Sequence, residues 1–162
     1  MKKLFFIICV SICISCNSQL DKAIEYNNTL LKEQQWISSE IKSYLDIIKD
    51  TSQTERLEEA KRQLLIDIEE SIIKVEKLTD FNGNFEFKRS VIAVLNTYHE
   101  GVKTDYDAIA TYQLLPTSEK TQDKKWQAEQ HTIYADEIIS KKEDYFILMQ
   151  QKFAKENNID LD

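Results

Sequence analysis

Residues 57–78, LEEAKRQLLIDIEESIIKVEKL, decide the fold class. The apolar residues of this stretch return at steps of three and four: Leu57, Ala60, Leu64, Ile68, Ile72, Val75 and Leu78. Because an α-helix turns once in about 3.6 residues, this spacing places them on one face. Glutamates, lysines and an arginine occupy most of the positions between them. The stretch therefore predicts an amphipathic helix that buries one stripe.

Three further segments repeat this spacing. In residues 20–50 the predicted buried positions are Ala23, Asn27, Leu30, Gln34, Ile37, Ile41, Tyr44 and Ile48. In residues 87–112 they are Phe87, Val91, Leu95, Tyr98, Val102, Tyr106, Ile109 and Tyr112. In residues 126–153 the stripe is less regular, with Trp126, Tyr134, Ile138, Tyr145, Met149 and Phe153, widened by Ile133, Ile139, Phe146 and Leu148. The sequence thus predicts four helices.

The predicted connections between these helices are short. Residues 52–55 read as a capping box, residues 80–84 contain Gly83, and residues 115–118 contain Pro116. The whole chain has only two glycines and one proline, so tight hairpins between strands are not expected. Long helices joined by short connections become antiparallel neighbours. We therefore expect an all-α domain, an up-down-up-down antiparallel four-helix bundle over residues 20–162.

Residues 1–15 form a segment of a different kind. Lys2 and Lys3 precede an uncharged run, LFFIICVSICIS, at residues 4–15. A positive start followed by such a run is typical of a secretory signal peptide. A transmembrane helix needs about 20 apolar residues, so this run is too short to be one.

The end of the run resembles the lipobox of bacterial lipoproteins, in which a small residue stands before the cysteine that becomes the mature N-terminus. Ser15 fits the small position and Cys16 the cysteine, whereas Cys13 stands where leucine is usual. The resemblance implies cleavage between Ser15 and Cys16 and lipidation of Cys16, with residues 16–19 as a short tether. Asn17 is not acidic, which favours the outer membrane. An ordinary secretory signal is the alternative reading.

The net charge of the mature chain limits the partners that we expect it to bind. Without Lys2 and Lys3 the chain keeps 19 basic residues against 28 acidic ones, a balance of −9. An acidic surface repels phosphate backbones, so we do not expect nucleic acid as a partner.

No pattern for catalysis, cofactor binding or metal binding stands out. Di-metal bundles use Glu-x-x-His pairs, but Asn96 and Ala128 stand three residues before His99 and His131. A haem site formed by one of these histidines and Met149 is an alternative that the sequence leaves open, although no residue spacing indicates it. We expect no catalytic residue, no cofactor and no metal, and we do not expect an enzyme.

Three carboxamides and one tyrosine fall on predicted buried faces. Asn27, Gln34, Gln130 and Tyr98 form either a closed polar network that sets helix register or the lining of a pocket, because buried amides need hydrogen-bond partners. Gly101 lies in mid-helix, where glycine costs about 1 kcal/mol relative to alanine. We expect it to allow the close approach of a neighbouring helix.

Three stretches resemble bacterial surface-lipoprotein families built as helical bundles. They are AIEYNNTLLKEQ at residues 23–34, FNGNFEFKRSVIAVLNTYHEGVKTDYDAI at 81–109 and FAKENNIDL at 153–161. The resemblance implies a membrane-anchored bundle and carries over no catalytic residue. We therefore expect a lipid-anchored envelope module that docks a protein partner. The alternatives are a carrier that holds a small ligand or cofactor in the bundle interior, and a purely structural envelope protein.

Overall fold

The computed structural model describes the backbone of residues 5–50 and 55–161, and the side chains from residue 19 onward within these ranges. Its helices are α1 (Phe5–Lys49), α2 (Leu57–Lys77), α3 (Glu86–Lys103), α4 (Asp105–Leu114) and α5 (Gln122–Glu156), with a short 3₁₀ turn, η2 (Thr117–Glu119). The described residues contain no strand. The prediction of an all-helical fold in which four helices pack together is confirmed.

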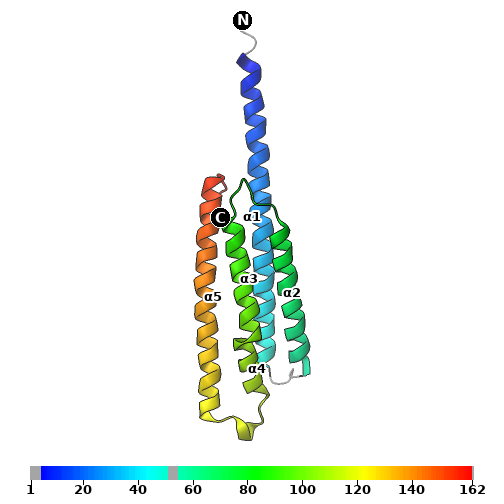
Figure 1. The fold of residues 1–162 in the computed structure, drawn as a ribbon, viewed down its shortest axis with the longest axis vertical. Coiled ribbons are helices and arrows are strands. Elements are labelled where there is room, and N and C mark those ends of the chain that lie inside the picture. The colour runs from blue at the N-terminus through cyan, green and yellow to red at the C-terminus, as the bar shows by residue number, and fades with distance from the viewer. Residues whose placement is uncertain (1–4, 51–54, 162) are drawn as a thin grey trace.

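The helices lie side by side as a long rod (Figure 1). α1 ends and α2 begins at the same end of the rod as the α4–α5 connection, and the α2–α3 connection lies at the other end, where α1 enters and α5 ends. The first turns of α1 extend beyond the remaining helices. Within the described residues, no helix has both the length and the apolar character needed to cross a bilayer.

The packing between helices is uneven. α3 packs closely against α2 and α5, and α1 packs closely against α2. α1 and α5 approach each other much less closely than these pairs do, and α3 lies between them in Figure 1. On the side between α1 and α5, here called the open side, the two helices are joined by side-chain contacts such as that of Tyr26 with Phe153 rather than by close backbone packing.

The predicted stripes of the first three helical segments form most of the core. All eight predicted positions on residues 20–50 are buried, including the two carboxamides Asn27 and Gln34. In α2 the buried residues are Leu57, Leu64, Ile68, Ser71 and Val75, and in α3 they include Phe87, Val91, Leu95, Tyr98 and Val102. Burial of these apolar faces is the main force that holds the helices together.

An aromatic cluster closes the core at the end where α1 enters. The ring of Phe153 on α5 lies 5.5 Å from Tyr26, 5.7 Å from Phe81 and 5.3 Å from Phe87. Phe146 stacks on Phe87 at 5.9 Å. Aromatic pairs at such separations contribute beyond the area they bury. The cluster joins α1, α3, α5 and the α2–α3 connection.

The predicted third helix is interrupted, which the sequence analysis did not anticipate. Thr104, with φ −117° and ψ −72°, separates α3 from α4. Its N–H and its hydroxyl both donate to the carbonyl oxygen of Glu100, at 3.0 and 2.8 Å. A threonine hydroxyl that bonds back to the preceding turn competes with the backbone and bends helices.

The predicted stripe of the last helix is partly wrong. Trp126, Tyr134 and Tyr145 are exposed, whereas the buried residues of α5 are Ala128, Ala135, Phe146, Phe153 and Ala154. α5 carries apolar residues on two opposite faces, and the face with the larger aromatic side chains points outward. The core contacts the face that carries the three alanines, Phe146 and Phe153.

The described connections follow their predicted chemistry. Gly83 has φ +77°, and the side-chain oxygen of Asn84 accepts from the Glu86 N–H at 3.1 Å. Leu115, before Pro116, is extended with ψ 142°. The predicted capping box depends on Ser52, which lies outside the described residues.

Candidate functional site

A buried tyrosine joins three helices on the open side of the bundle. The hydroxyl of Tyr98 on α3 accepts from the Gln34 amide of α1 at 3.1 Å and donates to the Glu143 carboxylate of α5. Tyr98 is 2% exposed, so these contacts are shielded from water. Gln34, Tyr98 and Glu143, here called the Tyr98 node, connect α1 and α5 through α3.

Burial and hydrogen bonding keep the Tyr98 phenol protonated. Burial raises the pKa of Tyr98 well above 10, and its hydrogen bond to Glu143 raises it further, while hydrogen bonds from Ser38 and Gln34 lower it only in part. Burial likewise raises the pKa values of Tyr26 and Tyr106 to about 12. At neutral pH these three phenols therefore remain protonated.

Asn27 lies apart from the Tyr98 node. Its side-chain oxygen accepts from the Gln150 amide at 3.4 Å, and its amide donates to Asn28 at 3.2 Å. Gln130, the third predicted carboxamide, is exposed on α5 and joins neither group. The expectation of one set of four residues is thus wrong: Gln34 and Tyr98 form a closed network, Asn27 belongs to a separate group, and Gln130 is on the surface.

A groove of about 820 Å³ runs along the open side between α1 and α5. We call it the α1–α5 groove. Six carboxamides line it: Asn27, Asn28, Gln35, Gln150, Gln151 and Asn158. Six leucine and isoleucine side chains alternate with them, and Asp160 is the one charged residue of the lining. In a chain in which 30% of the residues are charged, such a lining is unusual.

The groove residues share a sequence feature, adjacent carboxamides, that was not among the predicted site features. The chain contains four pairs of adjacent carboxamides, at residues 27–28, 34–35, 150–151 and 157–158. The fold brings all four pairs to the α1–α5 side, although the first two are separated from the last two by more than a hundred residues. Both members of two pairs line the groove, one member of each other pair does, and Gln34 enters the Tyr98 node.

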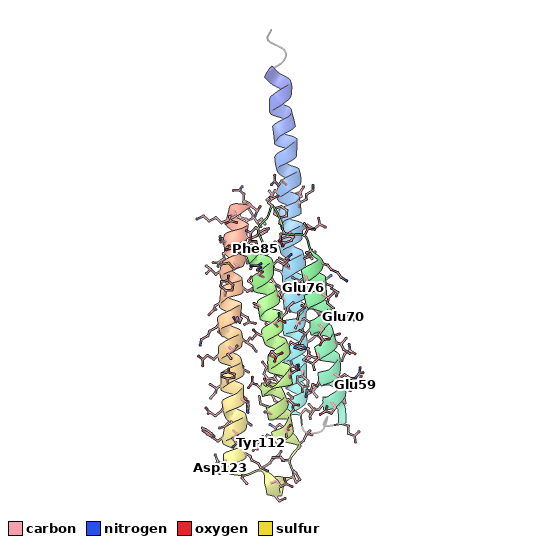
Figure 2. All side chains as sticks on the ribbon, in the orientation of Figure 1. Glu59, Glu70, Glu76, Phe85, Tyr112 and Asp123 are labelled. Atoms are coloured by element: carbon pink, nitrogen blue, oxygen red, sulfur yellow. The ribbon has the colours of Figure 1, made fainter. Side chains whose placement is uncertain are left out.

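Other parts of the surface have a different character. Glu59, Glu70 and Glu76 of α2 are all exposed to solvent (Figure 2). The Lys61 ammonium lies 2.5 Å from Asp107, and the Lys88 ammonium 2.5 Å from Asp80. The α1–α5 groove, with Asp160 as its one charged lining residue, thus differs from these charged parts of the surface.

Each of the two histidines lies beside a different carboxylate. A ring nitrogen of His99 lies 3.1 Å from Glu69, and His131 Nδ1 lies 2.8 Å from Asp105. His131 and Met149 lie on the same helix, about 27 Å apart at 1.5 Å per residue, so they cannot hold one haem together. In the described part of the chain, no three side chains of the metal-binding types gather into a group.

Lipidation of Cys16 and cleavage after Ser15 remain predictions, because the side chains before residue 19 lie outside those described. The feature that stands out in the described part of the chain is the α1–α5 groove with the Tyr98 node beside it. Comparisons with protein-family models, curated proteins and solved structures found no match to this chain.

Proposed function

We propose that this protein is a lipid-anchored module of the bacterial cell envelope and that its α1–α5 groove docks an uncharged amphipathic helix of a partner protein. The observation that carries the proposal is the convergence of all four carboxamide pairs on the one side of the bundle where two helices do not close on each other. Asn27 and Gln150 already bond to each other across the groove. The other four lining carboxamides, Asn28, Gln35, Gln151 and Asn158, are exposed and can form hydrogen bonds with a partner.

The lining of the groove indicates the chemistry of the partner. Carboxamides both donate and accept hydrogen bonds, so they suit neutral polar groups such as serine, threonine, asparagine and glutamine. The aliphatic side chains between them suit leucine, isoleucine and valine. With Asp160 as its one charged lining residue, the groove offers no counter-charge to an acidic segment and little to a basic one.

The shape of the groove favours a helix over an extended strand. Its α1 wall runs from Leu20 to Gln35, about 22 Å or four helical turns at 1.5 Å per residue. Recognition of a helix between two helices is a recurrent mode that needs no free strand edge, and the described residues contain no strand that a peptide could extend.

The proposed anchor places the groove beside the membrane. Residues 1–15 act as the signal peptide, and Cys16 carries the lipid in the outer membrane. The groove begins at Leu20, four residues along the same helix. The up-down-up-down antiparallel topology belongs to this proposal, and the alternation of the connections between the two ends supports it (Figure 1). The partner is therefore expected among envelope proteins.

Site-specific photocrosslinking in intact cells tests the proposal. A photoreactive amino acid is placed at Gln35 or at Gln151, one on each wall of the groove, and at the exposed Glu70 of α2 as the matched control. Both groove positions should label the same protein and the control should not. Mass spectrometry of the crosslinked peptide should identify an uncharged amphipathic helix.

Three results would contradict the proposal. One is the absence of any crosslink at both groove positions, as expected for a purely structural envelope protein. Another is equal labelling of the same protein from Glu70, which would show contact without a defined face. The third is a crosslinked peptide that is highly charged.

A further inference from the structure

A second cleft lies between α3 and α5. It has a volume of about 480 Å³ and is lined by residues of α3, Thr104, Asp105 and α5, with none from α1 or α2. Ala93, Gly101 and Ala135 are its small residues, and Ile138 and Ile139 add an apolar wall. Its volume falls within the range of sites for small organic ligands. We call it the α3–α5 cleft.

Gly101 is not required by the packing around it. A Cβ atom added at Gly101 meets one neighbour within 4 Å, the Tyr106 ring at 3.9 Å, which is an ordinary contact. The expectation that glycine allows a neighbouring helix to approach closely is therefore wrong. Glycine in a helix interior costs about 1 kcal/mol relative to alanine, and here its effect is to deepen the cleft.

Two further locally unfavourable features lie at the same cleft. Thr104 interrupts the helix, and the next residue, Asp105, is a carboxylate that is 8% exposed. Sequences break local rules mainly where function requires it. A mid-helix glycine without a packing role, a helix interruption and a buried carboxylate all contribute to the lining of one cleft.

Three charged residues line the cleft: Glu100, Asp105 and Lys142. Asp105 is paired with His131 at 2.8 Å and accepts from the Thr104 hydroxyl at 3.2 Å. Glu100 lies 3.4 Å from His99. Among the described residues, no carboxylate lies within 4 Å of the Lys142 ammonium, which is at the rim of the cleft.

We propose that the α3–α5 cleft binds a small amphipathic anion, a carboxylate with an aliphatic body. The body lies against Ala93, Gly101 and Ala135, and the head group pairs with the Lys142 ammonium, with the amide of Asn96 as a second donor. The long stem of a lysine can cover apolar surface while its charged end stays in water. This site is separate from the α1–α5 groove, so either proposal can fail without the other.

Photoaffinity labelling of the full chain tests this site. The probe is a decanoate analogue that carries a diazirine, and labelled residues are mapped by mass spectrometry. We expect labelling within residues 93–104 and 134–142 that is displaced by excess decanoate and much less by decanol. Lys142→Gln should weaken displacement by decanoate about tenfold. Lys141→Gln, which removes the neighbouring lysine paired with Glu137 at 2.5 Å, should leave it unchanged.

The Gly101→Ala variant distinguishes a loss of ligand binding from a loss of folding. The added methyl group meets no steric clash, so this variant should melt at a higher temperature than the parent chain while its labelling falls several-fold. Lower labelling of a more stable protein cannot result from unfolding. Three results would overturn the proposal. The first is a label that decanoate fails to displace, and the second is a label that maps to other residues. The third is labelling of the Gly101→Ala and Lys142→Gln variants that is as strong as that of the parent chain.

Discussion

Tyr98 is the residue on which three helices depend for their mutual position. It belongs to the largest fully buried side chains, and its hydroxyl has a partner on α1 and another on α5. A polar atom at such depth costs stability unless it is hydrogen-bonded, and here both partners are supplied by the fold. The Tyr98 node therefore sets the register of α1 and α5 across the open side.

Replacing Tyr98 with phenylalanine should lower the free energy of unfolding by about 1–3 kcal/mol, because the buried Gln34 amide and the Glu143 carboxylate lose their shared partner. Urea unfolding followed by circular dichroism measures the change. Tyr134→Phe is the matched control, since Tyr134 is 58% exposed and its variant should unfold like the parent chain. Equal midpoints for the two variants would show that the Tyr98 node contributes nothing to stability.

The sequence predicts part of the Tyr98 node. Gln34 and Tyr98 fall on helix faces that periodicity identifies as buried, and the structure confirms both positions. Glu143 is absent from that prediction because a carboxylate on a helix usually faces solvent. The contact joins residues 45 positions apart, and only the packing of α3 on α5 brings them together.

At the scale of elements, α5 shows where periodicity is insufficient. Apolar residues lie on two opposite faces of this helix, and Trp126 and Tyr145 are larger than the alanines on the buried one. A period of 3.6 describes either face equally well, so it does not decide which face is buried. The interruption at Thr104 is not predicted either, because neither proline nor glycine stands at that position.

Phe153 anchors α5 in the aromatic cluster, and its replacement tests the corrected assignment of faces. Phe153→Ala should lower the free energy of unfolding by about 3–5 kcal/mol, since it leaves a cavity among Tyr26, Phe81 and Phe87. Trp126→Ala removes a larger side chain that is 57% exposed and should cost well under 1 kcal/mol. Thermal or urea unfolding distinguishes the two, and a larger loss for the tryptophan variant would contradict the assignment.

At the scale of the whole molecule, the helical class follows from the sequence but the open side does not. Four amphipathic segments and a shortage of glycine and proline predict helices that pack together. Whether α1 and α5 close on each other depends on side-chain volumes in all the other interfaces, which no pattern along one segment records. The four carboxamide pairs can be recognised as parts of one surface only after the fold places them on the same side.

The proposed anchor predicts how the chain behaves in cells. Cys16→Ala should abolish incorporation of radiolabelled palmitate and shift the protein from the detergent phase to the aqueous phase, because acyl chains supply the membrane affinity at about 0.8 kcal/mol per buried methylene. Cys13→Ala is the matched control and should keep the label. Equal labelling of the Cys16→Ala variant and the parent chain would remove the basis for the anchor.

The position of η2 has a practical consequence for detecting the protein. This turn lies at the end of the rod opposite the entry of α1, and Thr117, Ser118 and Glu119 are all exposed (Figure 1). α5 alone spans about 52 Å at 1.5 Å per residue. With the chain anchored through Cys16 as proposed, an epitope inserted in this turn would stand clear of the lipid headgroups and stay accessible to antibodies, whereas a fluorescent protein fused to the C-terminus would crowd the bilayer.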